Sequence, residues 1–146
     1  MIKLLNETYK EMKDRQQSEY NNFKGVFYAF SEEQFNEGMK KLGLEKDDLN
    51  KIYRIGAGGY LLKTKDEDFK NMLDRFDKEQ KERMNDLNFC ISMFKYEMYN
   101  HEYSYTWELD DTLRSLNLTM EEINNNNILK EALKIAKNEV LYGNEE

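Results

Sequence analysis

The stretch Asp86–Asp111, DLNFCISMFKYEMYNHEYSYTWELDD, decides how the rest of the chain is arranged. Its first half predicts a buried helix that begins after Asp86 as N-cap, because apolar residues recur at spacings of three and four. Further aromatic and sulfur-containing side chains widen the apolar stripe until little polar surface remains, so this helix requires neighbours that cover it. The apolar residues are Leu87, Phe89, Cys90, Ile91, Met93, Phe94, Tyr96 and Met98.

The second half of this stretch concentrates aromatic and acidic side chains. Residues 99–107 include four aromatic residues, and seven acids stand against one base between Glu97 and Glu122. Tyrosine and tryptophan are common at interface hot spots, and an acidic surface favours a basic partner over nucleic acid. We expect Tyr99 and Trp107 to be mostly buried. The expected partner-binding residues are Glu97, His101, Glu102, Tyr103, Tyr105, Glu108, Asp110 and Asp111.

Length, charge and cysteine content favour one domain, residues 1–146, in a reducing compartment. The 18 Phe and Tyr residues can supply a core although 35% of the chain is charged. The net charge is about +1 over residues 1–63 and −8 over residues 64–146. The single cysteine cannot form an internal disulfide, and neither a secretory signal nor a membrane span is evident. We therefore expect a cytoplasmic protein that does not contact membranes.

Periodicity and turn signals predict an α+β fold in which five or six helices pack on a small three-stranded antiparallel sheet. The run DKEQKERMND after Phe76 predicts a half-helix that projects into water or meets the next helix at a bend, and a solvated face is the preferred interpretation. The expected elements are an amphipathic helix from Ile2 to Phe23, a strand at 26–30, a helix from a Ser31 capping box to Leu42 closed by Gly43, strands at 52–55 and 60–63, a long helix opened by Thr64, a short helix capped by Asp110 or Asp111, another opened by Thr119, and a last helix from Asn127 to Gly143.

The glycine-rich run Gly56-Ala57-Gly58-Gly59 joins two expected strands and predicts a β-hairpin turn, since glycine adopts positive φ without strain. Exposed glycine amides can also hold a phosphate, although neither GxGxxG nor the P-loop pattern is present. A small-ligand or nucleotide site is therefore the alternative hypothesis. Its expected residues are Arg54, Gly56, Gly58, Gly59, Tyr60 and Lys63, with His101 nearby.

Glu97 and His101 are four residues apart on a helix, so their side chains can meet. Together with Glu108, Asp110 and Asp111 they could form a carboxylate-rich site for a hard cation or for acid–base chemistry. The structural alternative is a histidine hydrogen-bonded near a helix C-terminus, and it is favoured here. The single histidine argues against zinc, and Cys90 has no nearby base. We expect no catalytic residue, metal or cofactor.

Four phrases of the chain resemble a family of small uncharacterised proteins encoded by bacteriophages and mobile elements of Firmicutes: VFYAFSEEQFNEGMKKLG, IGAGGYLLK, NHEYSYT and LNLTMEEI. This resemblance covers Phe27 to about Ala136. It implies an accessory gene of a mobile element, and one function that it suggests is the inhibition of host defence, as by anti-CRISPR proteins. We therefore expect a non-enzymatic binding or inhibitor protein, monomeric or homodimeric. Its expected partner is a basic protein surface, for instance of a host nucleic-acid-binding protein, and it does not bind nucleic acid directly.

Overall fold

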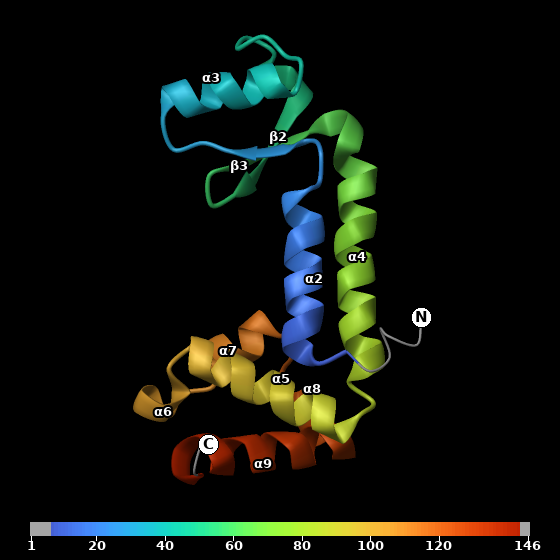
Figure 1. Cartoon of the computed structure of the whole chain (residues 1–146), viewed down its shortest axis with the longest axis vertical. Coiled ribbons are helices and arrows are strands. Elements are labelled where there is room, and N and C mark those ends of the chain that lie inside the picture. Colours follow the sequence, from blue (N-terminus) through green and yellow to red (C-terminus); the bar gives the residue numbers. More distant parts are fainter. Residues whose placement is uncertain (1–6, 144–146) are drawn as a thin grey trace. The chain divides into compact units, whose positions relative to one another are not determined.

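The computed structural model describes residues 7–143 and has an α+β fold (Figure 1). Within these residues, eight α-helices accompany one three-stranded antiparallel sheet, which confirms the expected fold class. The helices outnumber the expected five or six. The short helices α7 and α8 correspond to expected elements, whereas α6, a single turn of four residues, was not predicted. None of the helices in the described range is long and apolar enough to cross a membrane.

The chain divides into two compact units, which are described separately. One unit, called here the sheet unit, comprises residues 17–77, and the other, called the helical unit, comprises residues 1–16 and 78–146. Both boundaries fall inside helices, α2 (Tyr9–Asn21) and α4 (Asp66–Arg83). Ile2 and Leu5, expected on the apolar face of the first helix, lie outside the described residues. The expected single domain stays a prediction, which the number of unfolding transitions tests.

The sheet has the strand order β1-β3-β2, with both neighbouring pairs antiparallel. Its strands are β1 (Val26–Tyr28), β2 (Ile52–Gly56) and β3 (Gly59–Leu62), close to the expected positions. The first strand is shorter than the expected 26–30. The Ala29 N–H still donates to the Gly58 carbonyl of the hairpin turn, but the pairing stops there because the Phe30 N–H donates to the Gln34 side chain at the start of the next helix.

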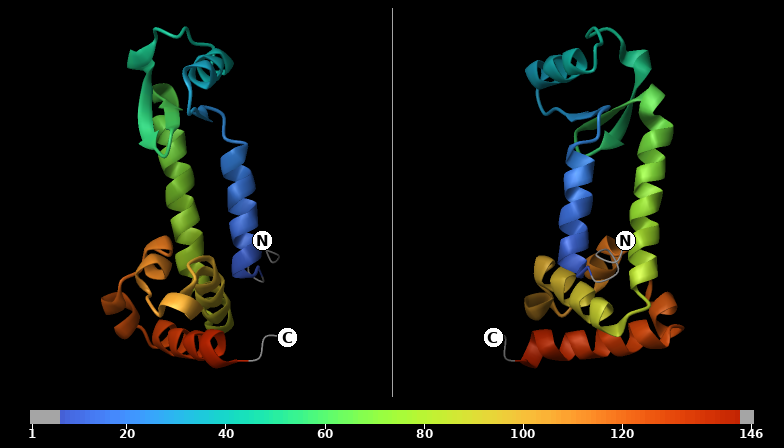
Figure 2. Two further views of the ribbon diagram at one scale, coloured as in Figure 1. Left: turned by 90° about the vertical axis from the view of Figure 1, so that its left-hand side faces the viewer. Right: turned by 45° about the vertical axis from the view of Figure 1, so that its right-hand side comes forward.

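Helix α3 (Glu32–Lys41) covers one side of the sheet (Figure 2). Ser31 caps it as expected, since its hydroxyl accepts from the Gln34 N–H at 3.2 Å. Its Phe35 ring meets Phe27 and Tyr60 edge-on, with ring centroids 5.7 and 5.1 Å apart. Gly38 lets the helix approach the strand, because a Cβ there would lie 2.1 Å from the Phe27 ring. This glycine is therefore required by packing.

The end of α2 and the start of α4 pack together within the sheet unit. Tyr20 and Phe23 both meet Phe69 edge-on, with ring centroids 5.8 and 5.4 Å apart. The expected capping of the long helix by Thr64 was wrong. Residues Lys63–Lys65 form a 3-10 turn, in which the Asp66 N–H donates to the Lys63 carbonyl, and α4 begins only at Asp66.

The core of the helical unit lies between α5 (Leu87–Asn100) and α9 (Asn127–Tyr142), which run side by side (Figure 2). As the sequence predicts, α5 is buried on most sides, and Cys90, Met93, Phe94 and Met98 are fully buried. Burial raises the pKa of Cys90 to about 12, so its thiol behaves as a small apolar group. The helix also packs on α6 (Tyr103–Thr106) and α7 (Asp110–Ser115).

Helix starts in the helical unit follow their caps with two exceptions. Asp86 caps α5 by accepting from the Phe89 N–H at 2.7 Å, and Thr119 opens α8 (Met120–Asn124) with a complete capping box, both as expected. The last helix is capped by Asn126 and not by Asn127, because the Asn126 side chain accepts from the Leu129 N–H. The expected cap of α7 was also wrong: Leu109 holds the cap position, and Asp110 and Asp111 form the first turn.

The polar second half of α4 is not simply a solvated face, which corrects the prediction made for this run. Arg15 binds the carboxylates of Glu7 and Glu79 at 2.8 and 3.1 Å. Gln80 is buried and donates to the Leu116 carbonyl at 2.9 Å. Buried polar groups that find partners fix one arrangement of the surrounding helices. Within the helical unit, this network joins α2 to the end of α4.

Candidate protein-binding surface

Residues Glu102–Asp111, called here the acidic aromatic segment, connect α5 to α7 through the short helix α6. Two residues with left-handed backbone flank α6: Glu102 with φ of 57° and Trp107 with φ of 60°. This conformation is uncommon for residues other than glycine, asparagine and aspartate, and it is rare for a bulky residue such as tryptophan. The chain therefore turns sharply on both sides of α6, and no glycine in the segment signals these turns.

One side chain of this segment holds it on the core, while its other aromatic residues face solvent. Tyr103 is only 2% exposed and belongs to the core cluster between α5 and α9. Tyr105 is 85% exposed and Trp107 is 59% exposed. The Trp107 ring contacts Tyr142 of α9 edge-on, with ring centroids 6.3 Å apart. Tyr103 thus anchors the segment in the core, and the segment exposes the side chains of Tyr105 and Trp107 to solvent.

The acidic side chains of the segment are exposed along its whole length. Glu102, Glu108 and Asp110 take part in no ion pair among residues 7–143, whereas Asp111 pairs with Arg114 at 2.6 Å. Part of this charge has a structural explanation, since acids in the first turn of α7 are favoured by the positive end of the helix. The remaining acids leave a surface of negative charge beside the exposed aromatic rings.

Glu97 meets His101 as the spacing predicts, but it lies in the core. The Glu97 side chain is nearly buried, its Oε2 accepts the Tyr9 hydroxyl, and its Oε1 lies 3.5 Å from Nε2 of half-buried His101. Burial and the hydrogen bond to Glu97 raise the pKa of Tyr9 far above its ordinary value. Glu97 is therefore a structural residue of α5.

Four predictions about exposure need correction. Glu97 and Tyr103 were expected on the partner-binding surface, but both are buried and cannot reach a partner. Tyr99 and Trp107 were expected in the core, but they are 48% and 59% exposed. For Tyr103 and Trp107 the physical reason is the pair of left-handed turns around α6, which directs Tyr103 inward and Trp107 outward. Glu97 is buried because it accepts the Tyr9 hydroxyl, and Tyr99 lies in the last turn of α5. The exposed members of the predicted surface are Glu102, Tyr105, Glu108, Asp110 and Asp111, with His101 at its edge.

The described residues contain no group of three or more histidine, cysteine or acidic side chains that could hold a metal ion. In particular, the carboxylates of Glu108, Asp110 and Asp111 do not converge on Glu97 and His101. Glu97 and His101 meet, but no third acidic side chain of residues 7–143 joins them in a group that could hold a metal ion.

The glycine-rich run forms a two-residue hairpin turn between β2 and β3, as the sequence predicts. Ala57 and Gly58 both have positive φ, 51° and 81°, which is the type I′ geometry that suits the twist of antiparallel strands. The turn packs against the end of β1, because a Cβ at Gly58 would lie 2.4 Å from the Phe30 ring. Its glycines are explained by strand geometry and packing.

The other residues of the alternative ligand site lie on two faces of the sheet. Arg54 pairs with Tyr60 across the strands, and both line an open cleft of about 490 Å³ with Phe30 and Phe35. Lys63 instead lies over the Tyr53 ring at 5.0 Å. Neighbouring residues of a strand point to opposite faces, so Lys63 contacts the face opposite to Arg54. The predicted cations do not converge on the turn.

The sequence interpretation missed two groups of side chains. Phe30 and Phe35 line the cleft beside Arg54, and no pattern in the sequence places them there. Lys130, Lys134 and Lys137 line a groove on α9, and their spacing of four and three residues was a readable sign of one helix face. Tyr142, which supports Trp107, was also not selected.

The fold and the surface define an α+β protein with a small antiparallel sheet and an exposed acidic aromatic segment on its helical unit. Residues 8–139 match the Family of unknown function (DUF7659), and the chain belongs to this family. The expected membership of a family of uncharacterised proteins is thereby confirmed. Comparisons with curated proteins and with solved structures found no match.

Proposed function

We propose that this protein is a non-enzymatic binding protein, whose acidic aromatic segment engages a basic surface of a partner protein. The observation that carries the proposal is the coincidence of two exposed aromatic rings, Tyr105 and Trp107, with the exposed carboxylates of Glu102, Glu108 and Asp110. Carboxylates aid the solvation of a protein surface, but an exposed tryptophan does not. Both kinds of side chain contribute to binding a partner.

The two kinds of side chain contribute different terms to binding. Tyrosine and tryptophan bury a large area and lose little conformational entropy, so they serve as anchors at an interface. The carboxylates attract a basic surface from a distance and accelerate association. The buried Tyr103 and the contact of Trp107 with Tyr142 hold the segment in place before binding, which lowers the entropy lost on association.

The finer part of the proposal concerns the biological setting. The resemblance to proteins of bacteriophages and mobile elements of Firmicutes supports an inhibitor that acts in the cytoplasm against a host defence protein. A row of carboxylates can occupy a basic surface that otherwise binds nucleic-acid phosphates. The preferred partner is thus a nucleic-acid-binding protein, and the inhibitor itself does not bind nucleic acid.

A pull-down from a host lysate tests the proposal with three forms of the protein. The first is the wild type, and the second carries E108K, D110K and D111K, which reverse the charge of the segment. The matched control carries E32K, E33K and E37K in the sheet unit, where three exposed acids also include two in the first turn of a helix. The control and the segment variant therefore have the same net charge, and each loses two acids from the first turn of a helix.

We expect the wild type and the control to capture a specific partner protein that the segment variant does not capture. Calorimetry with the purified partner then shows an affinity that falls as salt concentration rises, because charged surfaces are screened. Identical partner lists for all three forms count against the proposal, provided that circular dichroism shows the segment variant to be folded.

The alternative, a small-ligand binder, has one supporting observation: Arg54 and Tyr60 share an open cleft with Phe30 and Phe35. An aromatic cleft with one guanidinium group suits an anionic ring compound such as a nucleotide. Titration with a nucleotide panel, followed by the intrinsic tyrosine signal, tests it. Saturable binding that R54A abolishes favours this alternative, and no response rejects it.

A further inference from the structure

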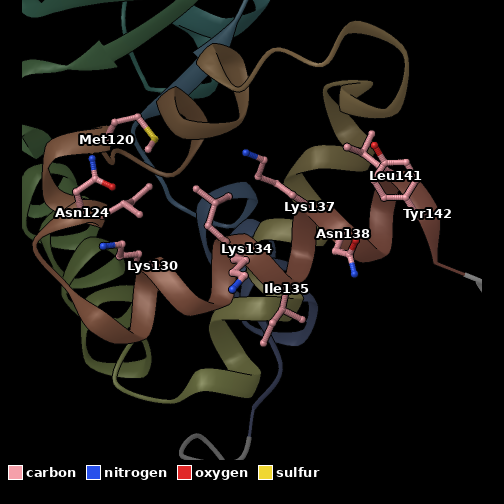
Figure 3. A pocket seen from close by; sticks show the side chains of 11 residues that line it. Met120, Asn124, Lys130, Lys134, Ile135, Lys137, Asn138, Leu141 and Tyr142 are labelled. Atoms are coloured by element: carbon pink, nitrogen blue, oxygen red, sulfur yellow. The ribbon is translucent and has the colours of Figure 1, made fainter.

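A groove on the helical unit lies along α9 and beside α8, on residues that the acidic aromatic segment does not include. Its volume is about 570 Å³, and Figure 3 shows its lining side chains. Lys130, Lys134 and Lys137 come from α9, and Met120 and Asn124 come from α8. Apolar side chains also line the groove: Ile123 and Leu133 are buried, Leu141 is half-buried, and Met120 and Tyr142 are exposed.

The groove is positively charged, although the whole chain is negatively charged. The protein carries a net charge of −7, yet the groove lining holds three lysines and no acidic residue. Among residues 7–143, no ion pair engages Lys130, Lys134 or Lys137. Like charges at spacings of three and four on one helix repel each other and destabilise it. No ion pair among residues 7–143 relieves this repulsion between the three lysines.

The exposed apolar side chains of the groove narrow the choice of ligand. A free phosphate or sulfate ion would use the lysines but would leave Met120 and Tyr142 uncovered, which are 42% and 68% exposed. Another basic surface would be repelled. An amphipathic helix satisfies both requirements, because its apolar residues at helical spacing cover these side chains while flanking carboxylates meet the lysines. The lysines span about 10 Å of α9, which corresponds to two turns of a bound helix.

We propose that the groove between α8 and α9 binds an acidic amphipathic helix of a partner protein. Aliphatic side chains of that helix cover Met120, Leu141 and Tyr142, and its Asp or Glu residues pair with Lys130, Lys134 and Lys137. The segment Glu102–Asp111 does not line this groove, although Tyr142, which does, contacts Trp107 of the segment. The two tests remain distinguishable, because the residues changed in one are not changed in the other.

Selection from a displayed library of random 16-residue peptides tests this proposal, because such a library presents many amphipathic helices at once. The full-length wild type is the target, and peptides that also bind K130E/K134E/K137E are removed. A second selection removes binders of K40E/K41E/K46E, a control with the same charge change on exposed lysines of the sheet unit. The enriched peptides are then synthesised, and their affinities are measured by fluorescence anisotropy.

The expected result is enrichment of peptides with apolar residues at helical spacing and with Asp or Glu on both flanks. Their affinity falls at least tenfold for K130E/K134E/K137E and stays within twofold for the lysine control. M120S, which trims an exposed side chain at the groove wall, weakens the same peptides at least threefold. Should the triple variant fail to fold, the single variant K134E replaces it, with at least a threefold loss.

Enrichment of neutral or basic peptides, or no enrichment beyond the control selection, overturns the proposal. Light scattering supplies a second possible refutation. If the wild type is a dimer that K130E/K134E/K137E dissolves while the lysine control does not, then a second copy of this chain occupies the groove, and the assignment to a partner helix is wrong.

Discussion

The Tyr9 hydroxyl donates a hydrogen bond to the Glu97 carboxylate inside the helical unit, which ties α2 to α5. Tyr9 is fully buried and Glu97 is 5% exposed, so neither group can exchange this bond for water. A buried carboxylate that loses a donor incurs a desolvation penalty. The pair explains why an acid occupies the most apolar helix of the chain without serving as a binding residue.

Replacement of Tyr9 by phenylalanine removes the donor and leaves the rest of the ring in place. We expect Y9F to lower the free energy of unfolding by about 1–3 kcal/mol, the usual effect of an unpaired buried polar group. Urea unfolding followed by circular dichroism measures this change. The control Y53F trims a hydroxyl from a 46% exposed ring and should change stability by less than about 0.5 kcal/mol. Equal stabilities of the two variants would contradict the structural role of the pair.

Stability should fall as pH rises above 9, and Cys90 should contribute to the fall. Burial raises the pKa of Cys90 from 9.0 to about 12, so the unfolded chain loses this proton at lower pH than the folded chain. The contribution is fully present below pH 9 and is lost as pH approaches 12. Tyr9, whose pKa is also raised, acts in the same direction.

The variant C90A tests this linkage through the slope of the unfolding free energy against pH. Its slope above pH 9 should be shallower than that of the wild type, whatever the difference in stability at neutral pH. Denaturant unfolding at a series of pH values gives both slopes. Parallel curves for the two proteins would show that Cys90 does not titrate as its burial requires.

Much of the fold could be predicted because local signals and packing agree. The apolar spacing of Leu87–Met98 located the central helix, and Asp86 and Thr119 located helix starts. The glycines at 56, 58 and 59 located the hairpin turn. Where signals competed, prediction was wrong by a residue: Asn126 and Asn127 are both good caps, and it is the Asn126 side chain that accepts from the Leu129 N–H.

The candidate site was harder to predict, since the exposure of a side chain depends on tertiary turns. Tyr103, Tyr105 and Trp107 look alike in sequence, yet Tyr103 is buried and the others are exposed. Their exposures differ because Glu102 and Trp107 adopt left-handed backbone conformations, and no glycine or asparagine at these positions indicates such conformations in the sequence. Glu97 looked like a surface acid because its hydrogen-bond donor, Tyr9, lies far away in sequence.

The single tryptophan makes the exposure of the acidic aromatic segment directly measurable. Trp107 is 59% exposed beside Glu108 and Asp110, so its emission maximum should lie near that of tryptophan in water. Relative to a free tryptophan amide, caesium should quench it more strongly and iodide more weakly, because the negative surface attracts cations and repels anions. The variant E108K/D110K/D111K should shift both ratios in the opposite direction. Wild-type ratios equal to those of the free amide for both ions would show that no negative field surrounds the ring.

The close contact between α3 and the sheet predicts a large effect of one added methyl group. In G38A the new Cβ would overlap the Phe27 ring, and the strain should lower the free energy of unfolding by about 1–3 kcal/mol. The control E37A lies on the exposed side of the same helix and should change stability by less than about 0.5 kcal/mol. Thermal unfolding monitored by circular dichroism compares them. A G38A protein as stable as the control would show that α3 does not approach Phe27 this closely.

A photo-crosslinking amino acid at Tyr105 tests the central claim most directly. This side chain is 85% exposed within the acidic aromatic segment, so a bound partner must pass within reach of it. The matched position is Leu49, which is 60% exposed in the sheet unit. After irradiation in a host lysate, the account predicts one discrete protein adduct from position 105 and none from position 49. Adducts of the same masses from both positions, or none from position 105, would contradict it.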